Sequence, residues 1–160
     1  MRHSTSWRKK QWKKSNEAQG IRTMIDAALD YRRRGWSVIP VKEKKAIGPW
    51  KQYQTTPPDE PTLRSLFSKA ADGIAVLLGS ASGGLCCRDY DDLGGYQRWE
   101  ASYPQLADTL PTVETHRGRH LYFRGPEQFI KLGDGEYRGT SGQYVVLPPS
   151  HHPKGTTIAG

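Results

Sequence analysis

The sequence contains no long run of apolar residues, and this absence argues against a protein built from membrane-spanning helices. No stretch of the 160 residues approaches the roughly 18 consecutive apolar residues that such a helix requires. Residues 1–14 are basic and polar without an apolar stretch, so they do not form a secretory signal. We therefore expect no membrane partner and a cytoplasmic location.

Cysteine is scarce, which excludes a fold held together by disulfides. The 2 cysteines, Cys86 and Cys87, are neighbours in an apolar run. Adjacent strand residues point to opposite faces, so these thiols are poorly placed to bridge each other. Hydrophobic residues make up 35% and charged residues 25% of the chain, which is typical of one folded domain rather than a disordered segment.

Acidic residues are outnumbered, 16 against 24 lysines and arginines, and the net charge of +8 predicts an anionic partner. Residues 1–14 contain no acid at all, but they hold 6 lysines and arginines together with Trp7 and Trp12. We interpret residues 1–17 as a basic arm and residues 18–160 as the folded domain. The arm is either a solvated tail or a segment that binds phosphates while its indoles stack on bases. The candidate nucleic-acid contacts are Lys9, Lys10, Lys13, Lys14, Lys44 and Lys45.

Apolar periodicity and turn residues predict an α+β fold. Helices are expected at 18–34, 62–71 and 92–103, and strands at 36–41, 73–78, 85–90, 111–116, 119–124, 143–147 and, with a weaker pattern, 130–137. The order predicts a mostly antiparallel sheet that ends in a hairpin, with helices on one face and the other face open to ligands. No closing element follows residue 158, which favours a C-terminally truncated fragment of a longer protein.

The most informative stretch is an apolar strand, 85–90, that runs directly into carboxylates. A strand period of two would place Asp89 and Asp91 on one face with their carboxylates close together. Like charges this close are unfavourable unless a cation lies between them, so without a metal the site is expected to be strained. Carboxylate pairs are typical ligands of Mg²⁺ or Mn²⁺ when substrate phosphates complete the coordination. The alternative is that these acids only cap the helix that begins at Asp92.

A second stretch places His120 at the start of an apolar strand, directly after a basic turn that contains Gly118. Arg117 and Arg119 beside it suggest an anion pocket, because arginine binds phosphate oxygens bidentately. His116 and His120 have the i, i+4 spacing of a zinc site, but this spacing is meaningful only on a helix, and the pattern favours a hairpin.

A third stretch contains Glu136 and Arg138, which share a strand face by the same period of two. One of them could complete a metal site while the other meets phosphate. The next strand runs into a Pro-Pro turn that carries Ser150, His152 and Lys154. The commoner explanation for such polar residues is an exposed loop.

Taken in order, GGLCCRDYD, THRGRHLYF and EYRGTSGQYVVLPPSH resemble the motifs of the bifunctional primase-polymerase domain. This family belongs to the archaeo-eukaryotic primase superfamily and is found on plasmids, phages and other mobile elements. ALDYRRRGWSVIPV and KKAIGPW also resemble the opening helix, strand and lysine loop of the family. The resemblance covers about residues 25–155. It implies an RRM-like palm of mostly antiparallel strands joined to an N-terminal α/β unit.

The resemblance also implies a DNA primase or polymerase, a nucleotidyltransferase that uses Mg²⁺ or Mn²⁺ to start or extend strands during replication. The family's metal ligands correspond to Asp89, Asp91 and Glu136, and its catalytic histidine to His120, which would contact the incoming triphosphate. Further candidates for nucleotide binding are Arg138, Arg119, Ser150, His152 and Lys154. The implied substrates are dNTPs or NTPs and a single-stranded DNA template, and a helicase of the same replicon is a further candidate partner.

The chain departs from the family pattern in its details. Arg117-Gly118 replaces the usual glycine pair before the histidine, and Glu136 stands where aspartate is commoner. The family domain also usually continues beyond residue 160.

Two rival functions remain open. One is a catalytically silent module of a replication initiator that binds single-stranded DNA or an origin. The other is a nicking initiator with paired histidines, although His151 and His152 are adjacent and would point to opposite faces of a strand.

Overall fold

The computed structural model describes residues 23–151 and 157–158. The helices are α2 (Met24–Arg33), α3 (Glu60–Leu66), α4 (Leu93–Ser102) and α5 (Pro104–Thr109), with 3-10 turns η1 (Lys51–Gln54) and η2 (Ser80–Ser82). The strands are β1 (Val38–Lys42), β2 (Lys45–Ala46), β3 (Gly73–Leu77), β4 (Leu85–Tyr90), β5 (Thr112–Glu114), β6 (Arg119–Arg124), β7 (Phe129–Leu132), β8 (Gly135–Arg138), β9 (Tyr144–Leu147), β10 (Ser150–His151) and β11 (Thr157–Ile158). None of the helices in these residues is long and apolar enough to cross a membrane.

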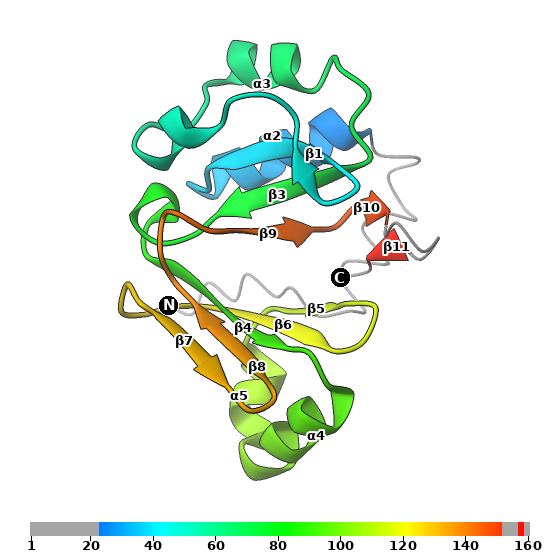
Figure 1. The fold of residues 1–160 in the computed structure, drawn as a ribbon, viewed down its shortest axis with the longest axis vertical. Helices are drawn as coiled ribbons and strands as arrows, with labels where there is room; N and C mark the ends of the chain where they lie inside the picture. Colours follow the sequence, from blue (N-terminus) through cyan, green and yellow to red (C-terminus); the bar gives the residue numbers. More distant parts are fainter. Residues whose placement is uncertain (1–22, 152–156, 159–160) are drawn as a thin grey trace.

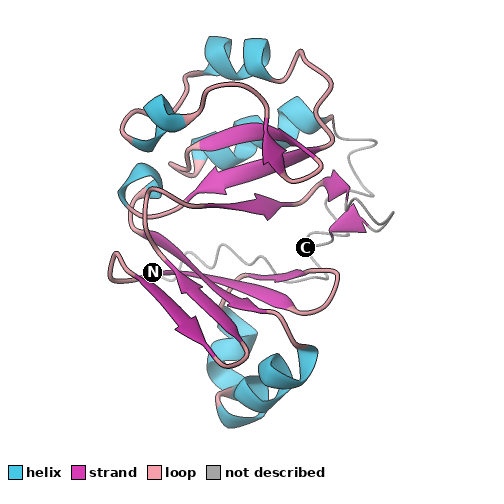
Figure 2. Cartoon of the chain, viewed as in Figure 1, coloured by secondary structure: helices cyan, strands magenta, loops and turns pink. Residues whose placement is uncertain are grey.

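The strands form two main antiparallel sheets that lie one above the other (Figure 1). A four-stranded sheet has the order β2-β1-β3-β9, and a five-stranded sheet has the order β5-β6-β4-β8-β7. The short strands β10 and β11 pair separately. This mixture of helices and antiparallel sheets confirms the α+β class (Figure 2).

The N-terminal part of the described fold begins with α2, whose start is fixed by its sequence. Thr23 and Asp26 form a reciprocal capping box, which satisfies backbone N–H groups that have no partner inside the helix. The helix ends before Gly35, which has the positive φ of +84° that favours glycine. Its buried face, which includes Leu29 and Tyr31, packs into the main core with residues of both large sheets.

The five-stranded sheet has one face covered by α4, on the side away from the four-stranded sheet (Figure 1). Tyr90 and Leu121 of the sheet pack there against Tyr96 and Trp99 of α4. Asp92 caps α4 by accepting a hydrogen bond from the Gly95 N–H at 3.0 Å. The strand-to-helix turn after β4 is therefore a defined cap, as the capping alternative predicts for Asp92.

Several boundaries differ from the expectations. The strand expected at 36–41 begins later, as β1 from Val38, and it contains Pro40 in its interior. The Pro40 carbonyl accepts a hydrogen bond from the Ile47 N–H, just beyond the two residue pairs that join β1 to β2. The N–H and C=O of one strand residue point to the same side, so the N–H that proline lacks would also have faced Ile47 and not β3. Helix α3 is shorter than expected and ends at Leu66, and α5, which Pro104 begins, was not foreseen.

The C-terminal half differs in its connections. The expected single strand at 130–137 is a hairpin of β7 and β8, which turns at Gly133 and Asp134. The expected closing hairpin is not formed, because β9 leaves the five-stranded sheet and pairs with β3. As a result, the chain crosses between the sheets directly after β8.

Candidate active site

The centre of the candidate site is a row of three polar residues on neighbouring strands. Asp89, near the end of β4, is paired with His120 of β6 on one side and with Glu136 of β8 on the other. Directly paired residues share a face of the sheet, with Cβ atoms about 4.5–5.5 Å apart. Strand register therefore brings together residues that lie in three separate motifs.

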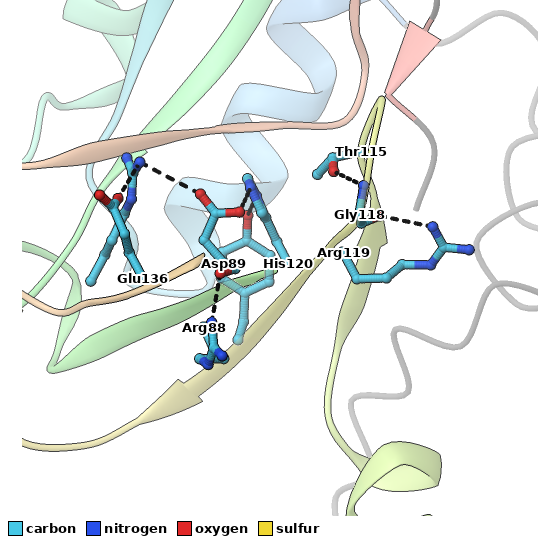
Figure 3. A network of polar contacts seen from close by, with 9 residues as sticks. Arg88, Asp89, Thr115, Gly118, Arg119, His120 and Glu136 are labelled. Atoms are coloured by element: carbon cyan, nitrogen blue, oxygen red, sulfur yellow. Dashed lines mark hydrogen bonds and ion pairs between the residues drawn. The ribbon is translucent and has the colours of Figure 1, made fainter. Parts of the chain in front are cut away.

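The side chains of this row contact one another (Figure 3). His120 Nε2 lies 3.2 Å from Asp89 Oδ1. Arg138, two residues after Glu136 and on the same face, places Nη2 2.6 Å from Glu136 Oε2 and 3.5 Å from Asp89 Oδ2. We call Asp89, His120, Glu136 and Arg138 the carboxylate cluster.

The charges of the cluster are compensated. Burial alone would raise the pKa of Asp89, but its hydrogen bond with His120 and the positive charges of His120, Arg138 and Arg88 lower it below the usual 3.8. The expectation that the acids strain the site when no metal is bound does not hold for Asp89. An imidazole and a guanidinium lie beside its carboxylate, so the ionised form is favoured.

Tyr122 contacts the ring nitrogen of His120 that faces away from Asp89. It follows His120 by two residues and lies on the same face of the sheet. His120 Nδ1 is 3.2 Å from the Tyr122 hydroxyl. Burial raises the pKa of Tyr122 well above its usual value, so the phenol keeps its proton and can donate it to Nδ1. With a ring proton on Nε2, His120 donates to Asp89 through Nε2 while its Nδ1 faces the Tyr122 hydroxyl.

The opposite face of β4 has a different role. Arg88 points away from Asp89 (Figure 3), pairs with Asp134 and lies over the Tyr90 ring at 3.9 Å from its centroid. It also donates a hydrogen bond to the backbone carbonyl of Asp89 at 2.7 Å. Alternate residues of one strand thus serve the cluster and the packing of α4.

Asp91 is not brought into the cluster. Strand β4 ends at Tyr90, and Asp91 is an exposed residue of the following turn whose N–H donates to the Asp134 carbonyl. The alternation that would align Asp91 with Asp89 therefore stops one residue too early. In the part of the chain that the structure describes, no group of 3 or more histidine, cysteine or acidic side chains could hold a metal by itself.

Arg119 also lies away from the cluster, because its side chain is on the α4 face of β6. Its guanidinium contacts Glu114 at 3.4 Å and lies 5.7 Å from the centroid of the Tyr96 ring. The anion pocket expected from Arg117 and Arg119 beside His120 does not include Arg119, since adjacent strand residues point to opposite faces. The zinc alternative fails for a related reason: His116 lies in the turn of a β5–β6 hairpin, not on a helix.

The remaining candidates divide into buried, distant and undescribed residues. Ser150 is buried, and its hydroxyl accepts from the Ile74 N–H at 2.9 Å and contacts the Leu147 carbonyl, so it serves the backbone. Lys44 and Lys45 lie at the β1–β2 hairpin, at the other edge of the four-stranded sheet from β9. The other candidates, Lys9, Lys10, Lys13, Lys14, His152 and Lys154, lie outside the described residues.

Sequence reasoning missed two kinds of residue near the cluster. Tyr122 could have been found, because it follows His120 at the strand period of two. Phe129 and Lys131 of β7 pair with Arg138 and Glu136, and so extend the face of the cluster. No signal in the sequence gives this pairing, since it depends on where the β7–β8 hairpin turns.

The comparison with known families agrees with this geometry. Residues 28–159 match the family model described as bifunctional DNA primase/polymerase, N-terminal. No curated protein matches the chain significantly. The matched range includes both sheets and every member of the carboxylate cluster, and it confirms the resemblance read from the three motifs. The chain belongs to the bifunctional DNA primase/polymerase N-terminal family.

Proposed function

We propose that this chain is a template-dependent nucleotidyltransferase that starts or extends DNA strands in the replication of a phage or other mobile element. The observation that carries the proposal is the carboxylate cluster on three paired strands within the range of the family match. Two carboxylates, an imidazole and a guanidinium on one face provide groups for a divalent ion and for a triphosphate.

The donor set fits a magnesium- or manganese-type ion that shares its coordination with substrate. The Arg138 guanidinium lies 3.5 Å from Asp89 and 2.6 Å from Glu136, so both carboxylates can contact one cation, which supports the proposal. Mg²⁺ commonly uses one or two protein carboxylates and completes its shell with phosphates and water. We assign Asp89 and Glu136 as ligands, and the exposed carboxylate of Asp91, which lies outside the cluster, as a third candidate that would have to move to join them.

The basic members of the cluster would bind the triphosphate. Arg138 can exchange its contacts with the carboxylates for bidentate contacts to phosphate, because its guanidinium presents several donors in one plane. His120 is held by Tyr122 with its Nε2 proton toward Asp89, where it can donate to a phosphate oxygen instead. A bound divalent ion would supply Lewis-acid stabilisation of the attacking hydroxyl and of the leaving pyrophosphate.

The substrates follow from this assignment. Nucleoside triphosphates, as dNTPs or NTPs, would be joined along a single-stranded DNA template, with a second nucleotide in place of a primer end when a strand is started. Residues 18–160 would form this catalytic domain and residues 1–17 a basic arm. A helicase of the same replicon is a candidate partner.

The test is incorporation of labelled dNTPs and NTPs on primed and unprimed single-stranded DNA, with Mg²⁺ or Mn²⁺. Glu136→Gln should lower incorporation by about 100-fold or more, as loss of a preorganised charge in an active site typically does. Glu60→Gln is the matched control, because Glu60 is an exposed carboxylate on α3 that forms an ion pair with Arg64 and lies outside the carboxylate cluster. Equal activity of wild type and Glu136→Gln, with DNA binding intact, would support the rival silent DNA-binding module.

A further inference from the structure

The edge strand β7 carries two side chains on the face of the carboxylate cluster. In the β7–β8 hairpin, Lys131 is paired with Glu136 and Phe129 with Arg138. Paired residues share a face, and both Glu136 and Arg138 point toward the cluster. The register therefore continues the row through Asp89 and Glu136 outward to Lys131, about 10 Å from Asp89 at two strand spacings.

Solvent exposure increases along the same direction. The side chain of Asp89 is 12% exposed, that of Glu136 24% and that of Arg138 30%. Phe129, at the edge, is 41% exposed as a residue, and Lys131 is exposed as well. The cluster thus opens toward β7, while its inner end, near Tyr122, is buried in the main core.

Among the described residues, the side chains of Phe129 and Lys131 make no contact that would stabilise the fold. Lys131 forms no ion pair there, and Phe129 belongs to none of the hydrophobic clusters and makes no ring contact. An exposed aromatic ring beside a lysine, at the open end of a row of charged groups, has the chemistry of a binding surface.

We propose that Phe129 and Lys131 form a platform for single-stranded nucleic acid, on which one base stacks against the ring while the ammonium group contacts a phosphate. The platform would deliver the strand to the carboxylate cluster, so the proposal rests on the function proposed above and specifies where its strand lies. The ammonium group of Lys131 and the neighbouring guanidinium of Arg138 favour an anionic occupant over an apolar protein surface.

The experiment measures binding of a fluorescent single-stranded oligonucleotide to the full chain by anisotropy, over a range of salt concentrations. Phe129→Ala should weaken binding by about 5-fold to 100-fold, the range expected for one lost stacking contact. Lys131→Gln should reduce the slope of log K against log salt by about 0.7, the value for one phosphate contact to a single strand.

Matched controls lie on the same strand and elsewhere on the surface. Ile130→Ala removes an exposed side chain from the opposite face of β7, and Lys69→Gln removes an exposed charge after α3. Both should leave binding unchanged. All four variants alter exposed side chains, and thermal melting should show wild-type stability.

Three results of these measurements would overturn the proposal, and each has a different cause. Unchanged binding by the Phe129 and Lys131 variants would show that the strand does not use β7. A similar loss in Ile130→Ala would mean that the face assignment is wrong. A shift of Phe129→Ala from dimer to monomer would identify β7 as a contact between copies. Because incorporation is measured separately with Glu136→Gln, the platform can fail while the proposed catalysis stands, and the reverse.

Discussion

At the scale of the residue, Asp89 shows how the fold prepares a carboxylate for binding cations. Its pKa is held below the usual 3.8, because the hydrogen bond and charge of His120 and the charge of Arg138 outweigh the effect of burial. A group whose pKa falls on folding stabilises the native state above its unfolded pKa, and this contribution is lost as the pH falls through the folded value.

This linkage gives a prediction for Asp89→Asn. In the absence of metal the variant should be less stable than wild type at pH 7, by about 1.5 kcal/mol, the lower end for a hydrogen bond to a charged group. The difference should begin to shrink as the pH falls below about 4, the usual pKa of an unfolded aspartate, and should vanish only below the lower pKa that Asp89 has in the folded state. Urea unfolding at several pH values measures it. Equal stability at pH 7 would mean that the ion pairs contribute nothing.

The same variant tests metal binding at this position. Mn²⁺ should raise the melting temperature of wild type, because a ligand that binds only the native state stabilises it by mass action. Asp89→Asn should show a much smaller rise. The same rise in both proteins would place the metal elsewhere.

Tyr122 is predicted to set the tautomer of His120. Tyr122→Phe removes the hydroxyl that faces Nδ1, and the fraction of imidazole with its proton on Nδ1 should increase. Turnover should fall by about 10-fold or less, since the general arrangement is kept. The tautomer is read from ¹⁵N NMR of the histidines and turnover from incorporation assays.

The matched control for this prediction is Tyr137→Phe, which removes a hydroxyl on the other face of the sheet that donates to the Pro126 carbonyl at 2.8 Å. It should leave the His120 signals unchanged. An unchanged tautomer in Tyr122→Phe would mean that Asp89 alone orients the ring.

At the scale of the element, the pairing of β4 with β8 positions Glu136 beside Asp89, and a glycine makes this close approach feasible. Gly135 has φ of +143°, and a Cβ added there would lie 1.9 Å from the Asp89 carbonyl oxygen. No side chain fits between the two strands at this point, so only glycine allows the register that forms the cluster.

Gly135→Ala should therefore destabilise the protein by more than about 2 kcal/mol and reduce incorporation in the fraction that still folds. Gly133→Ala, in the same hairpin turn, is the control, because an added Cβ there meets nothing within 4 Å. Urea unfolding compares the two variants. Similar stability of both would show that β8 can move away from β4 without cost.

At the scale of the whole molecule, the net charge of +8 predicts that much of the affinity for nucleic acid is electrostatic. Deleting residues 1–17 removes 6 lysines and arginines. The salt slope of single-strand binding should become shallower, by at most about 4 if every one of these cations meets a phosphate. Anisotropy titrations measure this, and an unchanged slope would assign the arm no role in binding.

The sequence by itself determined the class of fold and the family. Strand β4, strand β6 and helix α4 are where periodicity and capping place them, because their signals are local: β-favouring residues, turn glycines and the Asp92 cap. The three motifs in their order indicate the primase/polymerase family without any spatial information. The exchange of β9 into the other sheet was not predicted, since strand pairing depends on contacts between distant segments.

Only the tertiary structure decided which residues meet. Period two predicted that Asp89 meets Asp91 and that Glu136 meets Arg138. The second pair is in contact, but the end of β4 leaves Asp91 in a turn, and alternation places Arg119 on the other face from His120. The partners of Asp89 come instead from β6 and β8 by register. Strand register depends on where the hairpins turn and on which face of the sheet is buried. The spacing of residues within one segment predicts neither of these. The site is therefore a property of the sheet, whereas its motifs are properties of the chain.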